Sequence, residues 1–255
     1  MPASPLAPAA PRLAGVDGCP AGWLACLIDD DGPLAPEIRL FPRFADLLTE
    51  VDPAVVAVDM PIGLPDVIGP NGRGPERLVR PLLGERRSSV FSIPCRAAVW
   101  AGEGRDDRAG YAAACAAALA GSDPPKKVSK QAFNLFPKIR ELDRLMTPDL
   151  AARVFESHPE MAFTALNGGR PMTLPKKAKS RANPPGLDER RALLAAHGFA
   201  PALFAAPPPR GAGPDDLLDA CVLALVARRI RRGKALVFPD PPRLDGRGLP
   251  IAVRA

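Results

Sequence analysis

The apolar positions near the start of the chain predict a mixed α/β arrangement. We expect two strands joined by a Gly- and Pro-containing turn in RLAGVDGCPAGWLACLIDDDG, and a third strand in PEIRLF. A short helical pattern follows in FADLLTEV, before the unbroken apolar run PAVVAVDMP. A continuous apolar run of this length is typical of a strand that is buried on both faces of a parallel sheet.

Residues 69–150 carry helical patterns that we interpret as a largely helical insertion. Helices are expected near 75–84, 107–120 and 129–146. After the insertion, AARVFES predicts a strand, HPEMAFTALNGG a helix stopped by Gly168, and LDERRALLAAHGF another helix. The last long helix is expected to start at Pro214 or Asp215, and KALVFPD and GLPIAVRA return as short strands.

Composition divides the chain into a short leader and one domain. Residues 1–11 are rich in Pro and Ala, which is typical of a disordered leader, and residues 12–255 are expected to form a single domain. The net charge is +6, but the first 60 residues carry −6 and the remainder +12. A locally basic surface suits nucleic acid, although Arg-rich helices exposed to water would give the same charge.

Cysteine usage and hydropathy predict a cytoplasmic protein. The five cysteines are odd in number and contain no C-x-x-C, which argues against a zinc ribbon or a disulfide framework and favours a reducing compartment. The first residues do not read as a signal peptide, and YAAACAAALA is too short to span a bilayer. We therefore expect no membrane partner, and the sequence does not indicate the oligomeric state.

Four aspartates stand where a sheet and its covering helix would bring them together. Asp17 ends the first strand, directly before Gly18, and Asp59 ends the VVAV strand. Asp216 and Asp219 lie at i and i+3 on one face of the last helix. The carboxyl ends of strands open into the ligand crevice of α/β sheets, and carboxylate oxygens suit Mg²⁺ or Mn²⁺. We therefore predict a metal site formed by Asp17, Asp59, Asp216 and Asp219.

Each of these acids also has a simpler explanation. Asp17 before a glycine and Asp59 after a strand are common in turns. Asp215 is interpreted as the helix start, where a side-chain oxygen binds free amide groups, and Asp216 would complement the helix dipole. Asp219 lies a full turn inside an apolar helix, where an unpaired carboxylate is costly to bury. An arginine partner would satisfy it, but a shared metal explains the group more economically.

The segment VFESHPEMAF adds two acids and a histidine. In extended chain Glu156 and His158 point the same way, which favours Glu156 as a further catalytic residue. Glu160 has capping-box spacing from Ser157, so it is either a helix cap or part of the site. His158 is a metal ligand, a proton carrier or, most simply, a packed ring with a hydrogen bond. We keep His158 and Glu160 as candidates for substrate binding.

Basic segments are the candidates for contact with phosphates, because Arg and Lys position phosphate oxygens. They are Arg86, Arg87, Ser88 and Ser89 in GERRSSVF, Lys126, Lys127 and Lys130 in PKKVSKQ, and Lys176, Lys177, Lys179 and Arg181 further on. A charge run is usually only a solvated face. Aromatic residues are scarce, which counts against base stacking as the main binding mode.

An ordered set of motifs resembles the family called domain of unknown function 429. The motifs are GVDGCPAGW, VAVDMPIGLPD, LGERRSSVFSIP, VSKQAFNL, ESHPEMAF and DDLLDACVLA, in this order from about residue 15 to the final GLPIAV. The resemblance implies a ribonuclease H-like mixed sheet flanked by helices, and a nuclease. That superfamily places one acid on the first strand, one after the fourth and one or two on the last helix, which match Asp17, Asp59, Asp216 and Asp219. GPERLVRP departs from the family pattern, so no role is assigned to its arginines.

Three functions follow from these expectations. The first is a metal-dependent nuclease, in which Asp17 bridges two Mg²⁺ or Mn²⁺ ions and the basic segments hold a structured nucleic acid, DNA or RNA. The second is a non-catalytic binding or regulatory protein that keeps the fold and pairs its acids with Arg or Lys. The third is a nucleotide-binding phosphotransferase of the sugar-kinase or actin type. CPAGW lacks the polar phosphate-gripping residues which that class needs, and the chain has no Walker A sequence.

Overall fold

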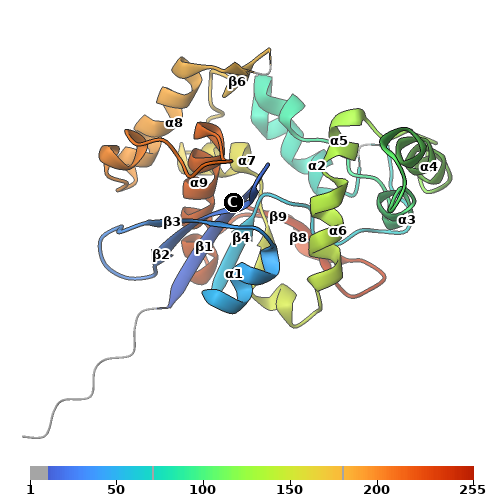
Figure 1. The fold of residues 1–255 in the computed structure, drawn as a ribbon, viewed down its shortest axis with the longest axis horizontal. Coiled ribbons are helices and arrows are strands. Elements are labelled where there is room, and N and C mark those ends of the chain that lie inside the picture. The colour runs from blue at the N-terminus through green and yellow to red at the C-terminus, as the bar shows by residue number, and fades with distance from the viewer. Residues whose placement is uncertain (1–10, 71, 180) are drawn as a thin grey trace, which may run out of the picture.

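A mixed five-stranded sheet forms the centre of the described chain (Figure 1). The computed structural model describes residues 11–70, 72–179 and 181–255, so all but the last residue of the expected leader at 1–11 lies outside the described residues. The strand order is β3-β2-β1-β4-β5. β1 pairs antiparallel with β2 and parallel with β4, β2 pairs antiparallel with β3, and β4 pairs parallel with β5. The strands are β1 (Arg12–Cys19), β2 (Gly22–Asp29), β3 (Glu37–Phe41), β4 (Val55–Val58) and β5 (Val154–Glu156).

Alternating side chains of the strands feed two hydrophobic cores, one on each face of the sheet. Val16, Ala25 and Val58 face the core shared with α1 (Phe44–Glu50) and α6 (Phe136–Leu145). Leu24 and Ala57 face the opposite core, which is covered by α7 (Pro159–Leu166), α8 (Pro184–Ala196) and α9 (Pro214–Arg231). Because β4 is buried throughout, its unbroken apolar sequence is explained.

Gly15 allows α9 to lie directly against β1. A Cβ at this position would stand 1.9 Å from the Ala224 nitrogen and 2.2 Å from the Ala220 oxygen, so no larger residue fits without moving the helix. The backbone of α9 therefore approaches the strand more closely than side chains on both elements would permit. This contact sets the height of Asp219 over the end of β1.

The helices between β4 and β5 confirm the expected helical segment (Figure 1). They are α2 (Pro75–Val79), the 3₁₀ segment η1 (Arg80–Ser89), α3 (Arg96–Trp100), α4 (Asp107–Ala120), α5 (Lys130–Asn134), α6 and the 3₁₀ turn η2 (Leu150–Ala152). The helix expected over 129–146 is broken at Leu135, because Pro137 has no N–H for the α-helical bond to the carbonyl four residues earlier. The helix expected over 75–84 becomes 3₁₀ from Arg80.

Two small antiparallel pairs lie outside the main sheet. The segment expected as a basic loop contains β6 (Lys177–Ala178) and β7 (Arg181–Ala182), which form a short hairpin. The expected terminal strands are confirmed as β8 (Val237–Leu244) and β9 (Pro250–Arg254), with η3 (Pro201–Phe204) preceding α9. In the part of the chain that the structure describes, no helix is both long and apolar enough to cross a bilayer.

Candidate functional site

Acids from three separate elements meet at the carboxyl edge of the sheet. Asp17 lies on β1, Asp59 directly follows β4, and both stand on the face of the sheet that α9 covers. The Asp59 N–H donates to the Val16 carbonyl at 2.9 Å, which ties the two strand ends together. Asp219 lies one turn inside α9, and its charge acts on both Asp17 and Asp59. The three acids therefore lie within electrostatic range of one another, and the metal site expected from Asp17, Asp59, Asp216 and Asp219 stays a prediction.

Burial, with repulsion from neighbouring carboxylates, raises the pKa of each of the three acids. The pKa of Asp17 lies well above its usual value because the side chain is buried and faces the charges of Asp219 and Asp59. Burial, followed by the charge of Asp219, raises the pKa of Asp59 to about 8. Burial raises the pKa of Asp219 to about 6 against the opposing effect of Lys176. With all three acids ionised, the cluster would carry more negative charge than the protein around it neutralises, so protons are retained to higher pH.

Lys176 is the counter-charge that sequence reasoning did not assign to this site. Its ammonium contacts Asp219 Oδ2 and lies 3.9 Å from Glu160 Oε1. The Asp219 Oδ1 atom is buried with no hydrogen-bond partner, and the Asp59 carboxylate makes no hydrogen bond or ion pair with any described residue. Asp17 Oδ1 accepts only the N–H of Gly18, at 2.8 Å. The Lys176 ammonium thus pairs with one of the three acids, Asp219.

A buried arginine fixes the segment that carries Lys176. The guanidinium of Arg190 is fully buried and donates to both oxygens of Glu160, at 2.7 and 2.8 Å. It also donates to the Leu174 carbonyl at 2.9 Å, two residues before Lys176. Glu160 is therefore neither a helix cap nor a free site residue, and the Ser157 hydroxyl, its expected capping partner, donates instead to the Arg254 carbonyl at 2.6 Å.

The two acids in the first turn of α9 have other roles than expected. Asp216 Oδ2 accepts the Gly213 N–H at 2.7 Å, so Asp216 closes the helix start. Asp215, expected at that start, pairs with Lys177 Nζ at 2.6 Å. Burial raises the pKa of Asp216, whose charge also acts on Asp17. Asp216 therefore lies near the cluster, with one oxygen already used.

Glu156 lies on the opposite face of the sheet from Asp17 and Asp59. Val154, two residues earlier on β5 and therefore on the same face as Glu156, packs into the core shared with α1 and α6. Its oxygens accept from Arg73 at 2.5 and 3.0 Å and from the Ile62 N–H at 2.7 Å. Such a fully occupied carboxylate orders the chain that follows β4. This is a structural role in place of the expected catalytic one.

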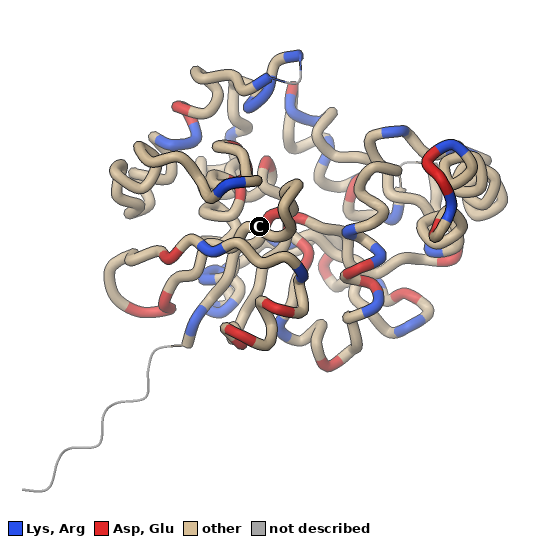
Figure 2. Tube along the Cα trace, in the orientation of Figure 1, with Lys and Arg blue, Asp and Glu red and all other residues tan. Residues whose placement is uncertain are grey.

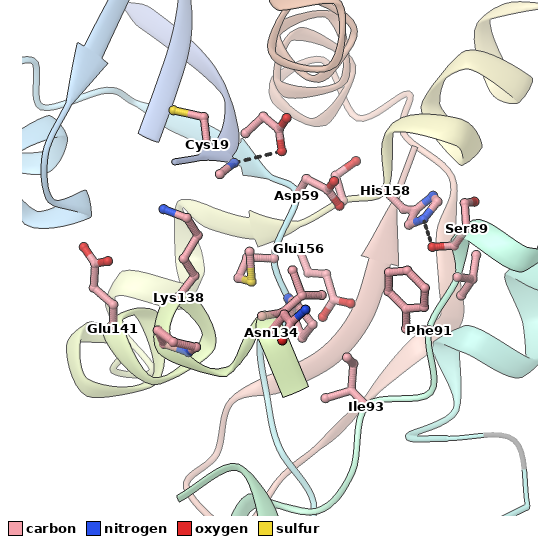
Figure 3. A pocket seen from close by; sticks show the side chains of 18 of the residues that line it. Cys19, Asp59, Ser89, Phe91, Ile93, Asn134, Lys138, Glu141, Glu156 and His158 are labelled. Atoms are coloured by element: carbon pink, nitrogen blue, oxygen red, sulfur yellow. Dashed lines mark hydrogen bonds between the residues drawn. The ribbon is translucent and has the colours of Figure 1, made fainter. Parts of the chain in front are cut away.

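His158 matches the packed-ring interpretation. Its Nε2 lies 3.4 Å from the Ser89 carbonyl, and burial lowers its pKa to about 4, so the ring is neutral at pH 7. The Nδ1 atom is buried without a hydrogen-bond partner among the described residues. Figure 3 shows the ring beside Ser89, on the wall of the cavity described next.

A cavity of about 680 Å³ opens in front of the acids (Figure 3). Asp17 and Asp59 line it from the sheet, and Asn134 and Lys138 line it from α5 and α6, with Lys138 next to Gly18. Phe91, with other apolar side chains, forms a third wall. The Lys138 ammonium is held by the Gly22 carbonyl at 2.6 Å and by the Trp23 ring at 4.4 Å. The cavity is large enough for a nucleotide-sized group.

The basic segments divide between this cavity and its surroundings. Ser89 lines the cavity, whereas Arg86, Arg87 and Ser88 lie on the same η1 segment outside it. The Lys130 ammonium lies over the rings of Tyr111 and Phe133, at 5.0 and 4.6 Å, and does not line it. Lys and Arg gather on the β6–β7 hairpin and on the α2–η1 segment near it (Figure 2).

The donor chemistry of the cluster fits a divalent cation, although its ligands do not form a closed shell. Carboxylate oxygens suit Mg²⁺ and Mn²⁺, and the unpaired Asp219 Oδ1 and Asp59 carboxylate are available to such an ion. Among the described residues, however, no three Asp, Glu, His or Cys side chains lie close enough to hold a metal without rearrangement. Asp17, Asp59 and Asp219 would hold the ion, and Lys176 would have to release Asp219.

The fold and cavity define a mixed α/β protein with an acidic cluster at the carboxyl edge of its sheet. A family model described as "Protein of unknown function (DUF429)" matches residues 15–244. The chain belongs to this family, as its ordered motifs indicate. No curated protein and no solved structure matched the chain.

Proposed function

We propose that the protein is a divalent-cation-dependent nuclease of ribonuclease H-like type. The observation that carries the proposal is the proximity of Asp17, Asp59 and Asp219, with raised pKa values and too few counter-charges, beside a cavity that Asp17 and Asp59 line. Acids on the first strand, after the fourth strand and on the last helix are the arrangement that the ribonuclease H-like resemblance implies. Excess negative charge in a recessed site is what a bound cation would neutralise.

The protein's own groups would position a phosphodiester in the cavity. Asp17 and Asp59 would hold the cation from the sheet, and Asp219 would complete the set from α9. A bound divalent ion would supply charge neutralisation at the phosphate and a water of lowered pKa. The apolar wall around Phe91 would keep bulk water away, and Asn134 would hydrogen-bond polar groups of the substrate.

One observation favours the second function, a non-catalytic binding protein. Lys176, Lys177 and Arg190 each pair with an acid near the site, which is the internal neutralisation that this function requires. Asp17 and Asp59 have no such partner among the described residues, so we place the nuclease first. If the protein binds nucleic acid but hydrolyses it with none of the metal ions tested, the non-catalytic binding function is placed first.

The test measures hydrolysis of labelled junction, duplex and hybrid substrates in Mn²⁺ and in Mg²⁺. We expect wild-type activity to be abolished by EDTA and to fall at least about 100-fold in Asp17→Asn, because a cation ligand is removed. Asp149→Asn, at an exposed aspartate far from the cluster in sequence, is the matched control. Full activity in Asp17→Asn would reject this site.

A further inference from the structure

A second cavity, of about 480 Å³, lies beside the acidic one and has the opposite charge. The two cavities share Val90 and Phe91, which form the wall between them. The second is lined by Arg80, Lys126 and Lys127, and none of the described carboxylates lines it. The acidic cavity is bordered by the carboxylates of Asp17, Asp59, Glu76, Glu141 and Glu156.

The cations of the second cavity come from two segments far apart in the chain, and both are anchored. The guanidinium of Arg80, at the start of η1, donates to the Val90 carbonyl at 3.0 Å and to Ser92 Oγ at 2.8 Å. The Lys126 N–H donates to Ser122 Oγ at 2.7 Å, which holds the lysine pair at the end of α4. The backbone thus presents Lys126 and Lys127 to the cavity.

Neither lysine ammonium has an ion-pair partner among the described residues, and the cavity adds hydroxyl donors. Ser88, Ser92 and Ser129 line it. Ser129 Oγ accepts the Ala132 N–H at 3.2 Å, so its own O–H remains able to donate. Two ammonium groups and hydroxyl groups are donors that bind phosphate oxygens, and the anchored guanidinium of Arg80 adds positive charge to the cavity wall.

We propose that this cavity binds a backbone phosphate next to the one cleaved, on a single-stranded segment of nucleic acid. The proposal rests on the proposed function, because the acidic cavity must hold the cleaved phosphodiester. Both cavities are lined by Val90 and Phe91. A strand enters both by splaying two nucleotides around Phe91, which a stacked and paired duplex does not permit.

The test is binding of a fluorescein-labelled single-stranded oligonucleotide, followed by anisotropy in EDTA over a series of salt concentrations. In the double variant Lys126→Ala/Lys127→Ala we expect about tenfold weaker binding. The slope of log K against log salt should fall by about 0.7, since the site neutralises one phosphate and each neutralised single-strand phosphate accounts for about 0.7 of that slope. Both lysines are exposed, so the fold should survive, which an unchanged melting temperature checks.

Lys130→Ala is the matched control, because this neighbouring lysine lies over Tyr111 and Phe133 outside both cavities. An unchanged slope in the double variant, or an equal fall in the control, overturns the proposal. Equal weakening for single-stranded and duplex oligonucleotides overturns the single-strand assignment. Displacement of the strand by millimolar inorganic phosphate at constant ionic strength overturns the backbone assignment in favour of a free phosphate.

Failure of this inference is distinguishable from failure of the proposed function. Asp59→Asn should bind the oligonucleotide at least as tightly as wild type in EDTA, yet hydrolyse nothing in Mn²⁺. If Asp59→Asn retains hydrolysis while the lysine variant loses binding, the phosphate site stands and the nuclease site fails. If Asp59→Asn abolishes hydrolysis while the lysine variant binds normally, the nuclease site stands alone.

Discussion

Replacement of Asp59 by Asn should stabilise the protein while abolishing its activity. The folded protein raises the pKa of Asp59 from 3.8 to about 8, by burial and by the charge of Asp219. Between these values the unfolded chain has lost a proton that the folded chain retains, so the unfolded state binds fewer protons. The free energy of unfolding therefore falls as pH rises from about 4 to about 8.

At pH 7 the raised pKa of Asp59 lowers the free energy of unfolding by at most about 4 kcal/mol, because each pKa unit is worth about 1.4 kcal/mol. Asp59 is only partly buried, and contact with water reduces the cost of ionising its carboxyl in the folded protein. We therefore expect Asp59→Asn to raise the free energy of unfolding at pH 7 by about 2 kcal/mol. Asparagine keeps the shape and has no charge to bury. Little difference is expected at pH 4, where the wild-type carboxyl is protonated in the folded protein.

The assay is urea unfolding of wild type and variant at pH 4, 6 and 8 in EDTA, with hydrolysis measured in parallel. Asp149→Asn, at an exposed aspartate, should leave both stability and activity unchanged. A variant less stable than wild type at pH 8, or a difference that does not change with pH, would refute the reasoning. Such a result would mean that Asp59 is not electrostatically strained.

Three further predictions test the surroundings of the acids. Lys176→Met should lower the free energy of unfolding by about 3 kcal/mol in urea unfolding, since it leaves the buried Asp219 carboxylate without its counter-charge; an unchanged midpoint would show that the ion pair is not formed. Gly15→Ala should cost about 3 kcal/mol or prevent folding because its Cβ would collide with α9, whereas Gly69→Ala, with open space around it, should not. Mn²⁺ at 100 times its dissociation constant should raise the free energy of unfolding by about 2.7 kcal/mol in wild type, measured as a rise in melting temperature that Asp59→Asn abolishes; an equal rise in both proteins would place the metal elsewhere.

Local sequence was sufficient to predict most elements of the fold. The strands β1 to β4 and the helices α4 and α9 match the patterns that predicted them, namely apolar runs bounded by turn residues and apolar segments of helical length. Breaks that depend on backbone chemistry were missed. Pro137 divides a predicted helix, and the short hairpin at Lys177–Ala178 lies in a segment whose composition is typical of a loop.

The convergence of Asp17 and Asp59 was likewise predictable, because parallel strands end at the same edge of a sheet and the residues follow those strands directly. The fate of Glu156 was not predictable in this way. In β5, which is only three residues long, alternation does not tell which face of the sheet Glu156 lies on until the core on each face is known. Arg73, which takes its oxygens, lies 83 residues earlier in the chain.

What the sequence determined by itself is therefore where the acids stand on their own elements: at the ends of two strands and one turn into a long apolar helix. Only the tertiary structure decided which charges they meet. Lys176 reaches Asp219 across 43 residues, and Arg190 holds the segment bearing Lys176 by binding Glu160 across 30. Pairing of this kind depends on where a loop folds back over the sheet, and a lysine in a basic loop carries no local pattern that distinguishes a buried partner from a solvated surface charge.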